Sequence, residues 1–225
     1  GYSPAKMEIY QDMIDVHLNG NFNTAVLNML NTKYIVYNPQ SPQVSINPEA
    51  CGNGWFVNEV KWVNTADDEI RALDAARLGD TAVFANPFNP KQTAVVRNTF
   101  KKDLEGYVFG KDSTASVTLT KYGLNDLEFM SKNNQNGLAV FSDIYYPYGW
   151  KAYIDGKEIP ILKANYLLRA IKVPAGEHKI KFEFHPDSFY TGDRIALISC
   201  LLLFGITGFS LFRLLKAGSK EEKTA

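Results

Sequence analysis

The segment 145–186, which reads YYPYGWKAYIDGKEIPILKANYLLRAIKVPAGEHKIKFEFHP, decides the fold of this 225-residue chain. Short apolar runs alternate with turn signals along it, which is typical of antiparallel β-strands. Asp155 and Gly156 form a dipeptide that favours a tight hairpin. From His178 to Phe184 apolar and charged residues alternate, so the sequence predicts a strand with one apolar face.

The same spacing continues upstream of this segment. Short strands at regular intervals, separated by turns, indicate an antiparallel β-sandwich, which we assign to residues 96–190. The predicted strands are 115–120, 126–131, 137–143, 150–154, 157–162, 167–173 and 178–184.

Residues 1–95 predict a small α+β unit that precedes the sandwich. Thr65 is expected to cap a helix, because its side-chain oxygen would accept a backbone N–H. Asp67, Asp68 and Glu69 follow in the first helical turn, where the helix dipole stabilises negative charge. We therefore interpret these carboxylates as dipole partners rather than as a catalytic pair. The expected helices are 4–18, 23–31 and 66–78, and the expected strands are 33–37, 55–63 and 81–85.

Residues 195–212 read IALISCLLLFGITGFSLF and carry no charge. As a helix they would span about 27 Å, close to the bilayer's hydrocarbon thickness of about 30 Å. We assign a transmembrane helix to 194–216, since the alternative, a buried soluble helix, rarely lacks a polar face over such a length. The basic residues from Arg213 to Lys223 predict a cytoplasmic C-terminus by the positive-inside rule, and we assign 217–225 as the cytoplasmic basic tail. Residues 1–193 would then lie on the extracytoplasmic side of a bacterial cytoplasmic membrane.

Composition excludes several other classes of protein. The formal net charge is zero, and the basic excess lies in residues 194–225, so the rest of the chain is mildly acidic and no nucleic-acid partner is expected. Cys51 and Cys200 predict no disulfide, because Cys200 lies within the apolar run. His17, His178 and His185 do not stand at ligand spacing, and we expect neither a metal nor a cofactor. Motifs for a nucleophile or a phosphate loop are also absent from the sequence, so no catalytic residue is assigned.

Four aromatic residues between positions 145 and 150 are the most specific candidate for a binding surface in the sequence. Flat rings can cover the C–H face of a sugar, and tyrosine hydroxyls can add hydrogen bonds. The cluster therefore predicts a glycan-binding surface, to which polar residues of a neighbouring strand pair would contribute. The alternatives are that the rings fill the sandwich core and that the polar residues, Lys163 included, are solvated strand edges. The assigned glycan-binding residues are Tyr145, Tyr146, Tyr148, Trp150, Asn165, Tyr166 and Arg169.

Three stretches of the sequence resemble the YfhO-like family of bacterial integral-membrane proteins. They are GYSPAKMEIYQDMID at 1–15, LNMLNTKYIVYN at 27–38 and, above all, 145–186 followed by the hydrophobic helix. Because the chain begins at Gly1 without an initiator Met, we expect it to be the C-terminal part of a larger protein.

The resemblance implies a multi-spanning glycosyltransferase of the GT-C type, which uses polyprenyl-phosphate-linked sugars to modify cell-surface polymers. The family's catalytic acid is expected near the start of the full protein, so this chain alone is not expected to be an enzyme. The expected partners are the lipid bilayer, the missing N-terminal transmembrane core, and a cell-surface glycan or polyprenyl-linked sugar. The alternative is an assembly module that mediates protein–protein contacts in the cell envelope without binding sugar.

Overall fold

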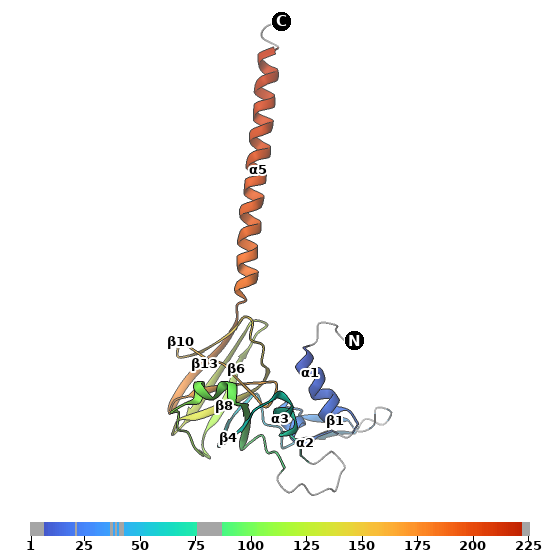
Figure 1. Cartoon of the computed structure of the whole chain (residues 1–225), viewed down its shortest axis with the longest axis vertical. Coiled ribbons are helices and arrows are strands. Elements are labelled where there is room, and N and C mark those ends of the chain that lie inside the picture. The colour runs from blue at the N-terminus through green and yellow to red at the C-terminus, as the bar shows by residue number, and fades with distance from the viewer. Residues whose placement is uncertain are drawn as a thin grey trace. The chain divides into compact units, whose positions relative to one another are not determined.

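The structure is a computed structural model that describes residues 7–20, 22–36, 38, 40, 43–75 and 87–221 (Figure 1). Two compact units make up the chain, Gly1–Phe184 and His185–Ala225. The first unit combines short helices with several β-sheets, and the second holds the long helix α5 (Asp187–Glu221). The predicted class, α+β with antiparallel sheets and a C-terminal helix fit to cross a membrane, is therefore confirmed.

Short helices and strands make up the N-terminal part of the first unit, and long strands make up the rest. The elements up to residue 104 are α1 (Glu8–Met13), η1 (Ile14–Leu18), α2 (Thr24–Met29), β1 (Tyr34–Val36), β2 (Val44–Ile46), β3 (Gly54–Val57), β4 (Glu59–Val63), α3 (Ala66–Arg71), β5 (Thr93–Arg97), η2 (Asn98–Phe100) and α4 (Lys101–Leu104). The later strands are β6 (Ser116–Tyr122), β7 (Asp126–Asn133), β8 (Gly137–Ile144), β9 (Trp150–Ile154), β10 (Lys157–Ile159), β11 (Leu162–Ala164), β12 (Leu168–Val173) and β13 (Gly176–Phe184).

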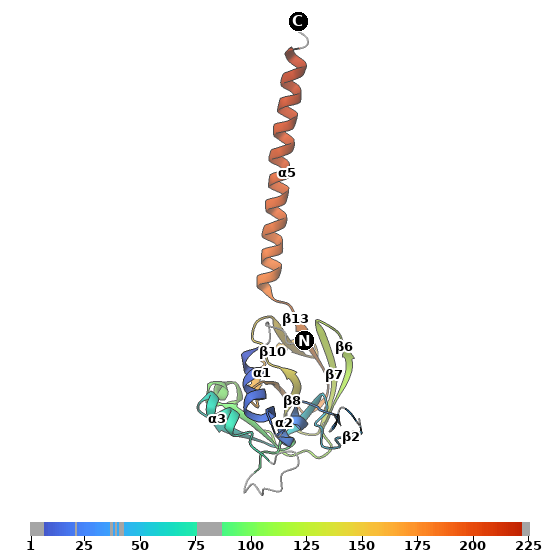
Figure 2. The ribbon, with the colours of Figure 1, turned by 90° about the vertical axis from the view of Figure 1, so that its right-hand side faces the viewer.

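Two antiparallel sheets form the sandwich. One has the strand order β10-β9-β13-β7-β6 and the other β11-β12-β8-β3, and Figure 2 shows β6 and β7 side by side. Phe129, Phe141 and Phe182 are fully buried between the sheets, with ring centroids 4.9 to 6.0 Å apart in edge-to-face pairs. Such pairs add about 0.5–1.5 kcal/mol each beyond the burial of their area. The core of the sandwich is thus built on phenylalanines from β7, β8 and β13.

The strands predicted for the sandwich are present, with one correction. The predicted strand 157–162 is wrong as a single element, because β10 and β11 belong to different sheets. Pro160 stands between them and has no backbone N–H to donate to a sheet, so it ends the first strand. The chain then crosses to the facing sheet.

The predicted strand 55–63 is likewise two strands. β3 pairs with β8 in the sandwich, whereas β4 pairs in parallel with β5. Between them, the Asn58 N–H donates to the Gln92 carbonyl at 2.7 Å. The predicted domain boundary between residues 95 and 96 stays a prediction. β3 lies before this boundary in sequence, yet it is an edge strand of one sandwich sheet.

The N-terminal helices are shorter or less regular than predicted. Helix 4–18 is α1 continued by the π-helix η1 over the described residues, and α3 ends at Arg71. The Thr65 cap is confirmed: its hydroxyl accepts the Asp68 N–H at 3.0 Å, and the Asp68 carboxylate accepts the Thr65 N–H at 3.2 Å. The predicted strand 81–85 and the end of helix 66–78 lie outside the described residues. Sequence reasoning also missed β2, β5 and α4.

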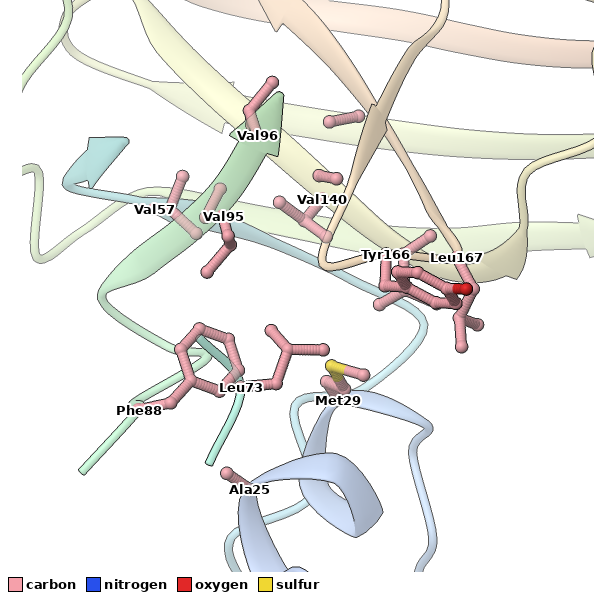
Figure 3. Close-up of a cluster of buried hydrophobic side chains, with 14 of the residues drawn as sticks. Ala25, Met29, Val57, Leu73, Phe88, Val95, Val96, Val140, Tyr166 and Leu167 are labelled. Atoms are coloured by element: carbon pink, nitrogen blue, oxygen red, sulfur yellow. The ribbon is translucent and has the colours of Figure 1, made fainter. Parts of the chain in front are cut away.

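A second buried cluster joins the helices to the sandwich (Figure 3). Met29 of α2, Val95 of β5, Val140 of β8 and Leu167 all have no exposed surface. Burial of a side chain of this size contributes about 1.5–3 kcal/mol. β5 is buried along its middle and so lacks the alternation that marks a half-exposed strand; its short apolar run is typical of a buried parallel strand, but sequence reasoning did not assign it.

Helix α5 has the length and composition of a membrane-spanning helix. The candidate span is Asp187–Arg213, 27 residues whose side chains are all exposed. An apolar helix whose side chains are exposed needs an apolar surrounding, because exposed hydrocarbon is unfavourable in water. The helix therefore fits a lipid bilayer.

Replacing Phe141 by Ala should destabilise the sandwich strongly. The change removes a ring that contacts both Phe129 and Phe182, and such core truncations cost about 3–5 kcal/mol. Thermal unfolding of the full chain in detergent, followed by near-ultraviolet circular dichroism, measures the loss. Met130→Ala, on the exposed side of β7, is the matched control, with an expected cost of about 0.5 kcal/mol or less. Equal midpoints for the two variants would contradict this packing.

Candidate functional site

An open groove lies at the end of the sandwich where β13 ends. Its volume is about 440 Å³, and aromatic rings form much of its wall. Trp150 begins β9 and is the register partner of Phe184, the last residue of β13, and their ring centroids lie 5.3 Å apart. Tyr146 approaches Phe184 to 6.5 Å and Tyr148 to 5.5 Å between ring centroids. Gly149, with a φ of 110°, lets the chain turn between Tyr148 and Trp150.

Arg169 of β12 lies at the base of this groove. Its guanidinium carbon stands 4.0 Å from the centroid of the Trp150 ring and 5.5 Å from that of Phe182. Nε donates to the Ile144 carbonyl at 2.9 Å, whereas Nη1 is buried with no hydrogen-bond partner in the part of the chain that the structure describes. Burial lowers the pKa of Arg169 to about 10, an effect that Asp143 opposes. A charged, incompletely bonded guanidinium thus supports an aromatic wall.

The structure brings four of the seven predicted glycan-binding residues together here, namely Tyr146, Tyr148, Trp150 and Arg169. Tyr146 and Tyr148 are 38% and 71% exposed, which rules out the alternative that these two rings fill the core. Tyr145 is half-buried: its ring packs edge-on against Phe100, 6.3 Å between centroids. With Tyr146 and Trp150, it lines a neighbouring hollow of about 220 Å³.

Asn165 and Tyr166 lie elsewhere, in the buried turn between β11 and β12. Asn165 Oδ1 accepts the Val95 N–H at 2.8 Å, and the Asn165 N–H donates to the Val95 carbonyl at 2.8 Å. The Tyr166 hydroxyl donates to an Asp12 carboxylate oxygen at 2.6 Å. Both turn residues have positive φ, 50° and 70°, which is uncommon for tyrosine. Their neighbours Lys163 and Arg169 are also buried, so the alternative of solvated strand edges is wrong.

A buried charge cluster surrounds Glu69, and here the interpretation of the three helix-start acids needs a correction. Glu69 has no exposed surface. Its Oε1 accepts the Tyr166 N–H at 3.0 Å, and its Oε2 lies 3.1 Å from Arg97 Nε and 3.4 Å from Lys163 Nζ. Asp67 and Asp68 remain at the helix start, but Glu69 is an ion-pair partner inside the protein rather than a dipole partner at its surface.

Burial is the largest influence on the charges of this cluster. It raises the pKa of Glu69 and lowers that of Lys163, and the attraction between the two groups partly offsets both effects. Glu69 does not line any of the four hollows described at residues 59–93, 153–183, 145–161 and 7–184. The cluster therefore connects α3, β5 and β11.

The contacts of two histidines and the state of both cysteines are also defined by the structure. His17 Nδ1 faces the Asn23 amide donor at 3.1 Å, so Nε2 carries the proton that it donates to the Ile70 carbonyl at 2.8 Å. His178 Nδ1 on β13 lies 2.6 Å from Asp155 Oδ2 in the turn between β9 and β10. Cys51 and Cys200 are both free thiols, and burial raises the pKa of Cys51 to about 12. Among the described residues, no three His, Cys, Asp or Glu side chains gather to hold a metal ion.

Sequence reasoning missed several groove residues. Leu124, Met7, Asn125, Ile144 and Phe184 line the groove with the aromatic cluster. The position of Phe184 on the apolar face, at the end of an alternating strand, could have predicted that it reaches this end of the sandwich. No sequence pattern predicts that Leu124 and Met7 line the groove, since their positions depend on how distant parts of the chain pack.

The geometry defines a β-sandwich protein joined to a single helix fit to cross a membrane, with an aromatic groove at the end of the sandwich. Residues 108–196 match the family model of the bacterial membrane protein YfhO. The resemblance to this family is therefore confirmed over that range, which includes the aromatic cluster and the start of α5. The family match and the apolar helix α5 together indicate membrane association. No curated protein and no solved structure is significantly similar to the chain.

Replacing Glu69 by Gln should destabilise the first unit by about 3 kcal/mol, because loss of one partner leaves buried cations uncompensated. The glutamine oxygen could still accept the Tyr166 N–H, so the change isolates the charge. Thermal unfolding of the full chain measures the effect.

Two further variants sharpen this test. Asp67→Asn removes an exposed carboxylate from the same helix and is expected to change stability little. Glu69→Gln combined with Lys163→Met removes both buried charges, and the double variant should be more stable than Glu69→Gln alone. A double variant that is less stable than the single one would show that the pair is not coupled.

Proposed function

We propose that this chain is a non-catalytic, extracytoplasmic C-terminal part of a multi-spanning membrane glycosyltransferase, and that its groove binds a glycan acceptor. The family match over residues 108–196 supports a membrane-protein role. The resemblance noted above supplies the GT-C type and the use of a polyprenyl-phosphate-linked sugar. The catalytic acid would lie in an early extracytoplasmic loop near the start of the full protein, upstream of this sequence.

The observation that carries the proposal is the exposed aromatic wall backed by Arg169. Tyr146, Tyr148 and Trp150 offer ring faces of the kind on which sugars stack. Arg169 lies against Trp150, so the ring's orientation is held before a ligand arrives. Its unpaired Nη1 could donate to a ligand oxygen after a small side-chain movement. Asn165 and Tyr166 would contribute indirectly, since their turn leads into β12.

A second candidate function, an assembly module without sugar binding, is favoured by a different surface. The β1–β2 hairpin exposes an apolar face in which Tyr34 opposes Ile46 and Val36 opposes Val44. These side chains are between 49% and 74% exposed. Apolar patches of this kind mark protein contacts, and the transmembrane core of the same protein is one candidate partner.

Sidedness is also part of the proposal. Residues 1–193 would lie outside the cytoplasm and the basic tail inside it, as the positive-inside rule predicts.

Glycan binding predicts that Trp150→Ala and Tyr148→Ala each weaken affinity about tenfold, equivalent to about 1.4 kcal/mol for one lost stacking ring. Saturation-transfer NMR of the full chain in nanodiscs, with an array of bacterial cell-surface glycans as ligands, measures this. Tyr34→Ala, an exposed aromatic on the hairpin, is the control and should leave glycan affinity unchanged. If no glycan gives a signal, or if all three variants behave alike, the assembly function is preferred.

Sidedness predicts that Val108→Cys in the full-length protein reacts with a membrane-impermeant maleimide in intact cells. Val108 is 81% exposed in the sandwich. Lys220→Cys in the basic tail should react only after the membrane is opened. The reverse pattern would place residues 1–193 in the cytoplasm.

A further inference from the structure

Four exposed apolar or aromatic side chains gather at the end of the sandwich where β13 ends. We call Tyr122, Leu124, Tyr146 and Tyr148 the Leu124 rim; they are 71%, 98%, 38% and 71% exposed, respectively. Single exposed apolar side chains are ordinary on a soluble surface, but a group of them marks a contact surface.

Internal contacts make the rim one surface. Tyr122 ends β6, and Leu124 lies in the turn that follows it. The Phe184 N–H donates to the Asn125 carbonyl at 2.8 Å, which ties this turn to the last residue of β13. Leu124 and Tyr146 line the same groove, and the Tyr146 and Tyr148 rings are 5.5 Å apart.

The chain limits how far this end of the sandwich can lie from a bilayer. Only His185 and Pro186 separate Phe184 from α5, and the uncharged run begins at Ile195. With helical rise from Asp187 onward and extended residues before it, Phe184 lies within about 22 Å of that point. The opposite end of the sandwich has no such restriction.

The first turns of α5 have the composition of a membrane interface. Phe189 and Tyr190 are 66% and 40% exposed, and the Tyr190 ring stacks on His185 at 3.8 Å between centroids. Aromatic residues of this kind lie at headgroup level at the ends of membrane spans. The helix therefore begins with aromatic residues suited to the headgroup layer. Only two residues separate this helix start from the end of β13, where the rim lies.

We propose that the Leu124 rim contacts the lipid headgroup layer beside α5, giving the sandwich a second attachment to the membrane surface. Leucine and tyrosine side chains gain by leaving water for this layer, where tyrosine hydroxyls stay hydrated. The charges beside Leu124 do not oppose the contact, because Lys121 and Asp126 pair with each other. The partner is the lipid surface itself; a protein partner at the rim is an alternative outcome of the test.

A spin label at Leu124→Cys tests the proposal in the full chain reconstituted in phosphatidylcholine–phosphatidylglycerol nanodiscs. The background carries Cys51→Ala and Cys200→Ser, so that only one thiol reacts. We expect the label to be several-fold less accessible to a water-soluble nickel reagent, and more accessible to oxygen, than a label at Val108→Cys. Val108 is an apt control because it is 81% exposed and apolar. It also follows Tyr107, whose hydroxyl lies within hydrogen-bond distance of the Gly137 and Val173 carbonyls, at the other end of β8 and β12.

The outcomes separate lipid from protein contact. Equal nickel accessibility at Leu124 and Val108 would overturn the proposal. Protection of Leu124 from nickel without a rise in oxygen accessibility would overturn it too, because a protein contact excludes both reagents whereas the lipid layer admits oxygen. Leu124 lines the groove, but the labelled samples contain no glycan, so this test stands whether or not the groove binds sugar. In a second variant, Leu124→Asp should restore nickel accessibility at a label on Tyr122→Cys.

Discussion

The buried carboxylate of Glu69 joins α3, β5 and the turn before β12, which the apolar cluster and the Asn165–Val95 hydrogen bonds also hold together. Its two oxygens receive the Tyr166 N–H and face the cations of Arg97 and Lys163. Desolvation of a carboxylate costs several kcal/mol, so the group is stable inside the protein only with these partners in place. The positive φ of Tyr166 is another cost, of about 1–3 kcal/mol, that the surrounding contacts must offset. The turn so fixed leads directly into β12, which carries Arg169 and through it supports Trp150. Stability at Glu69 is thus linked through one strand to the shape of the groove.

Much of the sandwich could be predicted from sequence because its signals are local. The alternation from His178 to Phe184 and the Asp155-Gly156 hairpin depend on neighbouring residues, and both have counterparts in β13 and the β9–β10 turn. Elements whose environment is set by tertiary structure were harder. β5 is buried and lacks alternation, and the 157–162 run hides a change of sheet that only Pro160 marked.

Charged residues show more clearly that a local sequence pattern does not determine whether a side chain is buried. Asp67, Asp68 and Glu69 have equivalent places in the sequence of a helix start, yet Asp67 and Asp68 are exposed and Glu69 is fully buried. What separates them is the direction in which α3 turns its side chains, together with cations from β5 and β11 that are remote in sequence. The aromatic cluster was visible because its members are adjacent, whereas Phe184, which completes it, comes from another strand.

Attachment by one helix alone would leave the sandwich poorly oriented. A single span would limit the distance of the first unit from the bilayer, but the two residues between β13 and α5 would still leave it free to rotate about backbone bonds. A second contact, through side chains tied to the end of β13, removes most of that freedom. Because Leu124 and Tyr146 belong both to the rim and to the groove, lipid contact would also set the direction in which the groove opens. An acceptor held near the membrane would then meet the aromatic wall at a fixed height, which favours reaction with a lipid-linked donor by restricting orientation rather than by adding contacts.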